Sequence, residues 1–385
     1  MINSSPLSEI RVLDLTRLLP GGVLTLMLAE LGAEIIKVEA PDGGDYARAM
    51  PPYTADHTGV IFHATNHGKR SIVIDLKQPE GVQLLRRLAK TADVLVESFR
   101  PGVMARLGCD YEKLAAENSR LVYCALSGWG STGTYAMKSG HDLNYAAIAG
   151  VIGAANMPQP AGAQMADIGG AYVALSGILA ALFRRERTGK GGFVDAGLFD
   201  AAVPQGIVQF AEAAAVASPF IGGALTGKQA CYNVYLAAGG QPVALAALEP
   251  KFWERFCLAV ERADLIEGYL LPERQPEITA QLKTLFAGKT ASEWAALLEP
   301  ADCCFSRVLA PEQALNDAHL QTRGVLAFDD QGNVRLRSPI HLDGMPPDME
   351  PAPPPMMGAD TDSVLQNIGC TEEEIIALRS AGVIA

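Results

Sequence analysis

The sequence is short of basic residues. Of its 385 residues, 31 are Lys or Arg and 43 are Asp or Glu, so the formal net charge is −12 at pH 7. Proteins that bind nucleic acid do so through basic patches, and this balance argues against DNA or RNA as the main partner. Net charge does not report where charges lie, so a local basic pocket for a small phosphorylated ligand is still compatible with it.

The chain also lacks a long uninterrupted apolar run. Gly, Arg or Glu breaks each apolar stretch well short of a membrane span, and no basic flank precedes the first one, as it would in a signal peptide. The C-terminal residues AGVIA match no peroxisomal or lipidation signal. The seven cysteines include no C-x-x-C pair, which is typical of reduced thiols. We therefore expect a soluble cytoplasmic protein with no membrane partner.

What the chain does contain is enough apolar material, 49% of its residues, for more than one core. Continuous apolar runs, typical of strands buried on both faces, occur at residues 11–16, 34–39, 71–76, 93–99 and 121–127. Helical stretches lie between them, for example at 22–31 and 79–90. This alternation predicts an α/β fold, in which a Rossmann-like, largely parallel sheet is covered on both sides.

The pattern changes in the second half of the chain. A long helix should begin near Asp167, and from about Cys231 two alternating runs around Gly239–Gly240 predict a β-hairpin followed by helices. We expect a large domain over 1–205 and 330–385, and a smaller α+β domain over 206–329. The proline-rich residues Pro346–Pro355 should form an extended connector to a short final helix.

Three motifs favour ordinary explanations. The segment Gly128–Gly133 fits G-x-G-x-x-G, but it follows the last strand of the series and no amphipathic helix follows it, so a glycine-rich loop beside an active site is favoured over a dinucleotide site. His57, His63 and His67 are close in sequence but have no acidic or cysteine partner at zinc spacing. The adjacent pair Cys303–Cys304 is a poor disulfide and a poor metal site.

Three other residues are candidates for chemistry. His141 follows the glycine-rich loop, at the edge of the sheet where α/β proteins bind ligands, and can exchange a proton near neutral pH. Asp167 lies at the start of the long helix, where it is either a helix cap or a carboxylate next to free backbone N–H groups that could hold an oxyanion. Glu249 ends an otherwise apolar run, where it either starts a helix before Pro250 or has a functional role.

With these residues identified, the chain resembles the family III CoA-transferase superfamily (the CaiB/BaiF group) and, within it, the α-methylacyl-CoA racemases. The matching segments extend from about Leu7 to about Leu309, with a weaker match over Gly358–Gly382. They include RVLDLTRLLPGG, LAELGAEIIKVEAP, NHGKRSIVIDLKQPEG, DVLVESFRPGVMARLG, RLVYCALSGWGSTG, SGHDLNYAAIAGV, ADIGG, RTGKG and ALEPKFW.

The resemblance implies roles for residues at the matching positions. His141 and Asp167 correspond to two bases that flank the α-carbon of an acyl-CoA substrate, and Glu249 corresponds to the acid that orients the histidine. The positions associated with the CoA phosphates and adenine are Lys37, Arg70, Arg100 and Arg106. The resemblance also implies an interlocked homodimer, with each active site between the large domain of one subunit and the small domain of the other. It implies no metal and no cofactor, since the CoA thioester is the substrate.

Two activities of this superfamily remain as alternatives. The first is racemisation of 2-methylacyl-CoA by a two-base mechanism, which the presence of His141 together with Glu249 favours. The second is transfer of CoA to a free carboxylic acid, with Asp167 as the nucleophile that forms an aspartyl-CoA intermediate. Ala163 stands where the racemases carry an asparagine, and Arg307 stands where proline is usual, so substrate and reaction type stay open. A CoA-ester binding protein without catalysis is a third, less favoured alternative.

Overall fold

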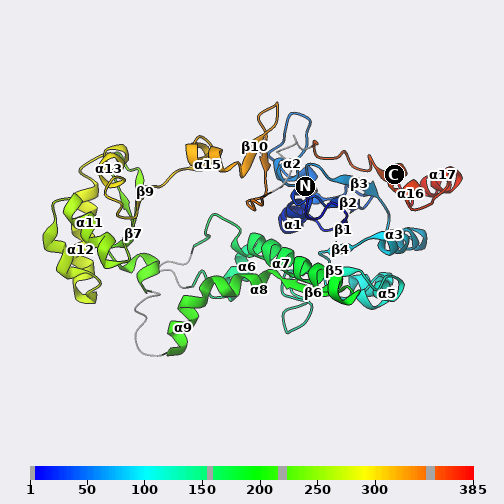
Figure 1. Cartoon of the computed structure of the whole chain (residues 1–385), viewed down its shortest axis with the longest axis horizontal. Helices are drawn as coiled ribbons and strands as arrows, with labels where there is room; N and C mark the ends of the chain where they lie inside the picture. Colours follow the sequence, from blue (N-terminus) through cyan, green and yellow to red (C-terminus); the bar gives the residue numbers. More distant parts are fainter. Residues whose placement is uncertain (1–4, 154–158, 216–222, 344–351) are drawn as a thin grey trace. The chain divides into compact units, whose positions relative to one another are not determined.

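The computed structural model describes residues 5–153, 159–215, 223–343 and 352–385. The chain forms two compact units (Figure 1). The large unit comprises Met1–Ala149, Ala161–Pro204 and His319–Ala385, and the small unit comprises Gly150–Pro160 and Gln205–Ala318.

The large unit is built on a six-stranded sheet in which every neighbouring pair is parallel, in the order β3-β2-β1-β4-β5-β6. The strands are β1 (Arg11–Leu15), β2 (Glu34–Glu39), β3 (Arg70–Val73), β4 (Val94–Glu97), β5 (Val122–Ser127) and β6 (Gly192–Gly197). This is the doubly wound Rossmann order, in which the chain reverses direction across the sheet between β1 and β4. The predicted fold class is confirmed. Strand β6 was not among the predicted strands, because its glycine-rich sequence GFVDAG lacks the apolar density of the others.

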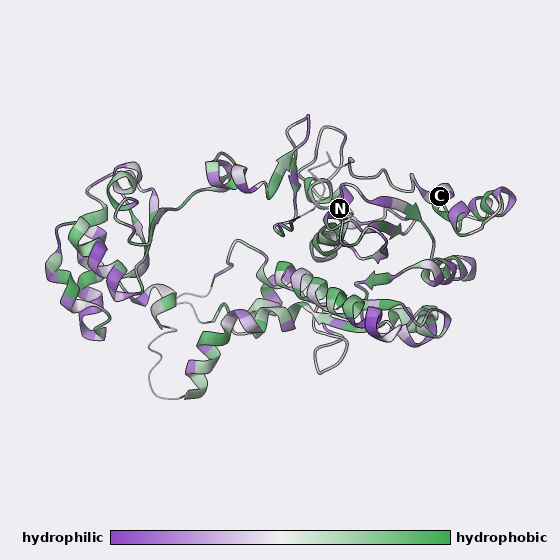
Figure 2. Cartoon of the chain, in the orientation of Figure 1, coloured by the Kyte–Doolittle hydropathy of each residue, from purple (hydrophilic) through white to green (hydrophobic). Residues whose placement is uncertain are grey.

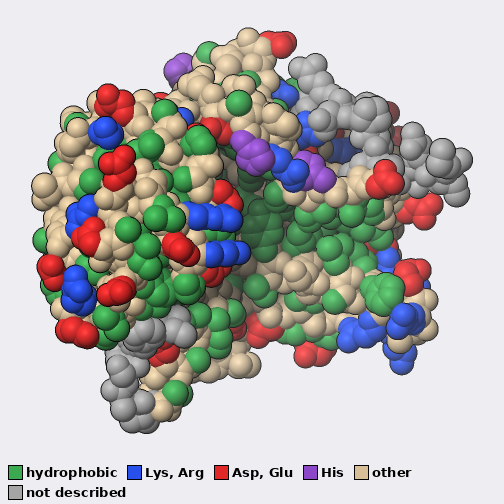
Figure 3. All heavy atoms as spheres, turned by 60° about the vertical axis from the view of Figure 1, so that its left-hand side comes forward, with side chains coloured by type: hydrophobic (Ala, Val, Ile, Leu, Met, Phe, Trp, Pro, Cys, Tyr) green, Lys and Arg blue, Asp and Glu red, His purple; other side chains and the backbone are tan. Residues whose placement is uncertain are grey.

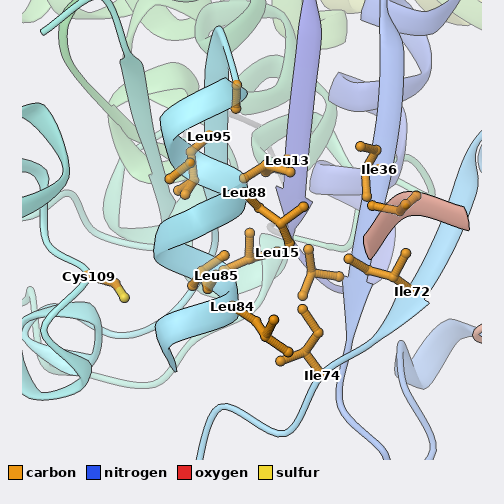
Figure 4. Packing of buried hydrophobic residues seen from close by; sticks show 14 of the residues in the cluster. Leu13, Leu15, Ile36, Ile72, Ile74, Leu84, Leu85, Leu88, Leu95 and Cys109 are labelled. Carbon is orange, nitrogen blue, oxygen red and sulfur yellow. The ribbon is translucent and has the colours of Figure 1, made fainter. Parts of the chain in front are cut away.

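One face of the sheet is covered by helices from both ends of the chain. Helix α3 (Pro79–Thr91) begins with proline in its first turn, and its Leu84, Leu85 and Leu88 pack with Leu13 and Ile72 of the strands in one apolar cluster (Figure 4). The same cluster includes buried side chains of α16 (Thr361–Asn367) and α17 (Glu372–Ser380). The C-terminal segment is therefore part of the core of the large unit.

The other face is covered by α1 (Leu18–Glu30) and α7 (Met165–Thr188), which pack against each other. Helix α7 has 24 residues and is, by length and composition alone, apolar enough to cross a membrane. It also packs on α8 (Leu198–Ala202), β5 and β6, so it is a core helix of this unit. Figure 2 shows its apolar length ending in hydrophilic residues, which include Arg185 and Arg187 in its last turn.

The small unit combines an antiparallel sheet with helices. Strands β7 (Tyr232–Leu236) and β8 (Pro242–Ala246) form the predicted hairpin around Gly239–Gly240, and β9 (Phe305–Arg307) pairs with β8. The helices of its core are α11 (Pro250–Ala259), α12 (Gln275–Phe286) and α13 (Ala291–Leu298). Their buried aromatic residues are Trp253, Phe256, Phe286 and Trp294.

The second segment of the small unit ends at Ala318, and the chain re-enters the large unit at His319, whereas the sequence predicted this boundary at residue 330. The physical reason is the hairpin of β10 (Leu326–Phe328) and β11 (Val334–Leu336), because β11 packs on α2 (Val60–Thr65) of the large unit. The expected connector over 346–355 lies outside the described residues up to 351, and residues 352–355 form neither helix nor strand.

The remaining elements are short. In the large unit they are η1 (Tyr46–Ala49), α4 (Val103–Leu107), α5 (Tyr111–Glu117), α6 (Asp142–Ile148) and η2 (Val203–Gly206). In and next to the small unit they are α9 (Ile207–Ala215), η3 (Ala224–Lys228), η4 (Ala263–Gly268), η5 (Pro272–Arg274), α14 (Pro311–Ala314) and α15 (Ala318–Arg323).

On the small unit, which comes forward in Figure 3, acidic, basic and apolar side chains are interspersed. Two exposed apolar side chains lie on β7 of the small unit, Val234 at 57% and Leu236 at 60% exposure. They alternate with Tyr235, which is buried in the core, so one face of this small sheet is apolar and uncovered within the unit.

Candidate active site

The glycine-rich loop follows β5 and leads to His141. Its backbone wraps around Tyr145, whose hydroxyl donates to the Gly140 carbonyl at 2.6 Å. A Cβ atom at Gly128 would lie 2.3 Å from the Tyr145 hydroxyl oxygen, and one at Gly140 would lie 2.8 Å from its ring. The indole of Trp129 meets the Tyr145 ring edge to face at 4.9 Å. These glycines therefore allow close packing of aromatic rings under the loop, and the next helix, α6, starts only at Asp142.

His141 is the residue that caps the N-terminus of α6. Its backbone is extended (φ −128°, ψ 174°), and its N–H donates to the Asn144 side-chain oxygen at 3.1 Å. The imidazole is exposed at the carboxyl edge of the sheet, where α/β folds bind ligands. The backbone thus places this imidazole where a substrate can reach it.

Asp167 lies in the first turn of α7 but does not cap it. The cap position is Gln164, and the carboxylate that binds the helix start is Asp142: its Oδ1 accepts from the N–H of Ala166 at 2.7 Å and of Asp167 at 3.1 Å. The alternative of Asp167 as a helix cap is therefore wrong. Asp142 accepts the hydrogen bonds of the helix start instead, so the Asp167 carboxyl is not needed for capping.

The N–H groups of this first turn are also already in use. Besides the two that bind Asp142, the N–H of Met165 donates to the Ala163 carbonyl at 3.1 Å and that of Ile168 to the Gln164 carbonyl at 3.0 Å. The expectation that free N–H groups at the start of α7 hold an oxyanion is wrong for this reason.

The electrostatics of Asp167 connect it with His141. Burial, together with the negative charge of Asp142, raises the pKa of Asp167 to about 6, while the charge of His141 lowers it. Burial and the nearby Asp167 also raise the pKa of Tyr145. The structure therefore brings an imidazole and a carboxyl group from separate elements, the starts of α6 and α7, into one electrostatic neighbourhood. A carboxyl group with a pKa near 6 can accept and donate a proton close to neutral pH.

Two of the four predicted basic residues are committed to internal ion pairs. Lys37 is fully buried, with its ammonium 2.9 Å from Asp45 and 3.6 Å from Asp14. Arg70 binds Glu34 at 2.8 Å and Asp360 at 3.2 Å. A phosphate contact at Lys37 would require this buried cluster to open, and one at Arg70 would have to compete with two carboxylates.

The other two, Arg100 and Arg106, are exposed and have no ion pair among the described residues. Arg100 follows β4 and Arg106 lies on α4, beside the point where the strand order reverses. The loop after β1 lies at the same point, because the Arg17 N–H donates to the Ser98 hydroxyl at 3.3 Å. Arg17 is a basic residue at this edge of the sheet that our sequence reasoning missed, although its position directly after the first strand was a usable signal.

Glu249 belongs to the small unit. It precedes α11, and its carbonyl accepts from the N–H groups of Phe252 and Trp253, as the helix-start interpretation requires. Its side chain makes no cap and is exposed. The carboxylate therefore has no structural task within this unit, although its charge raises the pKa of Cys304, after the larger effect of burial.

The histidines near the start of the chain have structural partners. His63 lies 2.9 Å from Asp329, and His67 contacts the Leu336 carbonyl at 2.8 Å, so both tie this region to the β10–β11 hairpin. In the part of the chain that the structure describes, no group of three or more His, Cys, Asp or Glu side chains could hold a metal ion.

Comparison with known proteins identifies the family. The sequence profile of CoA-transferase family III matches residues 7–361. The chain is a member of the family III CoA-transferases. Human alpha-methylacyl-CoA racemase is 33% identical over 392 residues, which cover 98% of this chain and 97% of that protein. The succinate–glutarate CoA-transferase of Agrobacterium fabrum is 45% identical over 205 residues, which cover 51% of each chain.

The fold of this family III member agrees with solved structures. A CaiB/BaiF family protein from Brucella suis superimposes with a TM-score of 0.82 at 28% identity, covering 95% of this chain and 100% of that one. Racemases and CoA-transferases thus both stand among its relatives, so the family assignment by itself does not choose the reaction. The choice depends on the chemistry of the site.

Proposed function

We propose that this enzyme racemises 2-methylacyl-CoA thioesters by moving the α-proton between His141 and Asp167. The observation that carries the proposal is the electrostatic link between these two side chains at the carboxyl edge of the sheet, with the pKa of Asp167 raised to about 6. An imidazole and a carboxyl group with this raised pKa can both accept and return a proton, as the removal of a weakly acidic α-proton requires. Their origin on separate elements suits action on opposite faces of one carbon.

The proton balance is simple. One group removes the α-proton, and the electron pair of that C–H bond moves into the thioester carbonyl to form an enolate. The other group, protonated at that moment, delivers its proton to the opposite face of the α-carbon. The product is the opposite enantiomer. The two groups together still hold one proton, now on the other group, and exchange with water restores their starting protonation state.

We assign the acyl-CoA substrate to the carboxyl edge of the sheet between β1 and β4, where folds of this kind bind ligands. The exposed Arg100 and Arg106, which have no ion pair in the described ranges, supply positive charge for the CoA phosphates. We assign Lys37 and Arg70, which the resemblance also suggested, a weaker role because their charges are already paired. No metal or prosthetic group enters the proposed step.

The second candidate reaction is CoA transfer to a free carboxylic acid. Above pH 6 the Asp167 carboxylate is ionised and can attack a thioester carbonyl, which expels the CoA thiolate and leaves an acyl-aspartyl anhydride. The thiolate then attacks the aspartyl carbonyl and releases the first acid, which leaves an aspartyl-CoA thioester for the second acid. Relatives named as CoA-transferases support this alternative.

One incubation separates the two reactions. 2-Methylacyl-CoA is incubated with the enzyme in heavy water, with and without a free carboxylic acid, and the thioesters are analysed by mass spectrometry. Racemisation predicts a gain of one deuterium at the α-carbon that needs no added acid. Formation of a new thioester from the added acid, without deuterium at the α-carbon, would instead establish CoA transfer.

We further propose that the enzyme is a homodimer. Helix α7 buries one face in the core, but Val173 and Phe183 on it are 45% and 63% exposed. Exposed apolar side chains along a core helix suit a surface that a second copy of the chain covers.

A further inference from the structure

The peptide unit that joins Gly140 to His141 is held at both of its polar atoms. Its carbonyl oxygen accepts from the Tyr145 hydroxyl at 2.6 Å, and its N–H donates to the Asn144 side-chain oxygen at 3.1 Å. A peptide unit is planar, so two bonds at its opposite sides fix both its position and its tilt. The unit ends at the Cα atom of His141, and these two bonds therefore fix the point from which the imidazole extends.

The peptide unit on the other side of His141 is held in a less specific way. The His141 carbonyl accepts from the backbone N–H groups of Asn144 at 2.8 Å and of Tyr145 at 3.2 Å. These are bonds of an ordinary helix start, which backbone groups of any sequence can make. The bond from the Tyr145 hydroxyl differs, because it requires one particular side chain.

The ring of Tyr145 is fixed in its place under the loop. It is buried, and its face or edge is met by the indole of Trp129, which also lies against Phe199 at 5.6 Å between ring centroids. Gly128 and Gly140 approach the ring so closely that neither position has room for a Cβ atom. The hydroxyl is therefore in position before a substrate arrives.

The hydroxyl also keeps its proton while Asp167 titrates. Burial, with a further contribution from the negative charge of Asp167, raises the pKa of Tyr145 above its ordinary value of 10. The pKa of Asp167 is about 6, far below that range. The Tyr145 hydroxyl can thus donate to the Gly140 carbonyl in both protonation states of Asp167.

We propose that Tyr145 is a positioning residue for His141, whose hydroxyl holds the Gly140–His141 peptide unit together with the Asn144 side chain and so aims the imidazole at the α-carbon. The inference rests on the proposed proton transfer, in which His141 acts on one face of that carbon. Tyr145 acts through the backbone and exchanges no proton itself. Misplacement of a reacting group by about 1 Å can cost about 100-fold in rate, so a fixed peptide unit matters here.

The test is Tyr145→Phe, which removes the hydroxyl and keeps the ring. The kcat for racemisation should fall about tenfold or more, with KM for 2-methylacyl-CoA unchanged. In heavy water, exchange should slow by a similar factor for the enantiomer that His141→Ala no longer exchanges, and should keep its wild-type rate for the other. A general loosening of the fold would slow both enantiomers equally.

The matched control is Tyr235→Phe. The Tyr235 hydroxyl also donates at 2.6 Å to a carbonyl five residues earlier, that of Ala230, but in the core of the small unit. Both variants lose the same kind of hydrogen bond, so their melting temperatures should fall by similar amounts. Only Tyr145→Phe should change the ratio of the two exchange rates.

Asn144→Ala gives a second way to free the same peptide unit if Tyr145→Phe does not fold. Asn144 is exposed, and its replacement releases the N–H end of the unit. It should slow exchange of the same enantiomer. The double variant should lose less activity than the product of the two single losses, because both bonds hold one peptide unit.

Nuclear magnetic resonance of the whole enzyme, with ¹³C-labelled histidine, reports on the imidazole without any reaction. The chain has six histidines, and His141→Ala identifies the signal of His141 by its loss. Tyr145→Phe should shift this signal, and Tyr235→Phe should not.

An unmoved His141 signal in Tyr145→Phe, or a loss of exchange that is equal for both enantiomers, would overturn the proposal. A wild-type enzyme that exchanges no α-proton, while Tyr145→Phe still shifts the His141 signal, would instead reject the proposed proton transfer and support the hold of Tyr145 on His141.

Discussion

The carboxylate of Asp142 accepts a hydrogen bond from the backbone N–H of Asp167 at 3.1 Å, and its charge adds to the larger effect of burial in raising the pKa of the Asp167 side chain. One residue thereby fixes the start of α7 and tunes a carboxyl group on it. Asp142 directly follows His141, so the same short segment places the imidazole and adjusts the carboxyl group with which it is proposed to work. This double role of Asp142 leads to separate predictions for charge and for hydrogen bonding.

Replacing Asp142 separates its two effects. Asp142→Asn keeps an acceptor for the N–H groups of Ala166 and Asp167 but removes the charge, so the pKa of Asp167 should fall with little change in stability. Asp142→Ala removes both and should also cost about 1–2 kcal/mol of unfolding free energy, as loss of a helix cap does. The measurements are pH–rate profiles and thermal melts. The acid limb of the profile should move to lower pH in both variants, and an unmoved limb would show that Asp142 does not tune Asp167.

The raised pKa of Asp167 also predicts a cost in stability. Its pKa of about 6 in the folded protein lies above the ordinary aspartate value of 3.8, so the folded protein binds more protons than the unfolded chain and loses stability as pH rises from about 4 to about 6. Asp167→Asn should therefore stabilise the enzyme at pH 7 by about 1 kcal/mol, after allowance for solvent screening of a partly exposed group. Urea unfolding at pH 7 and pH 4 tests this, because the gain should vanish at the lower pH. A gain of equal size at both pH values would contradict it.

Lys37 and Arg106 should respond differently to substitution. Lys37→Met leaves Asp14 and Asp45 without their shared buried cation, which should destabilise the fold by about 3–5 kcal/mol. Arg106→Ala should leave the melting temperature unchanged and raise KM for acyl-CoA roughly tenfold, as loss of one charged hydrogen bond predicts. A Lys37→Met enzyme that is as stable as the wild type but has a raised KM for acyl-CoA would contradict this account and show that Lys37 binds the CoA phosphates.

The proposed homodimer can be tested on the exposed face of α7. Val173→Asp introduces a charge at an exposed apolar position and should shift the molar mass measured by light scattering from two chains toward one. Lys190→Glu, which changes charge just beyond the end of the same helix, should leave the mass unchanged. A wild-type enzyme that already has the mass of one chain would contradict the proposal.

Much of the large unit could be predicted because buried parallel strands leave a strong local signal. The runs at 34–39 and 121–127 become β2 and β5 almost without change. The strand β6 was missed because its glycines carry no such signal. The resemblance placed Lys37 among the residues for the CoA phosphates and adenine, and a single lysine within an apolar strand does not reveal the two buried aspartates that meet it.

The site could be predicted only in part. The resemblance named His141 and Asp167, but nothing in their spacing indicated that Asp142, rather than Asp167, holds the start of α7. That contact joins residues more than twenty positions apart and depends on how α6 packs against α7. Long-range hydrogen bonds of this kind have no local pattern in the sequence.

The most direct test of the account follows each enantiomer of 2-methylacyl-CoA separately in heavy water with the His141→Ala and Asp167→Asn enzymes. Both variants should fail to interconvert the enantiomers, because each retains a base on only one face of the α-carbon. Any remaining deuterium exchange should be confined to one enantiomer in the first variant and to the opposite enantiomer in the second. Racemisation at the wild-type rate by either variant, or exchange of the same enantiomer by both, would contradict the two-base account.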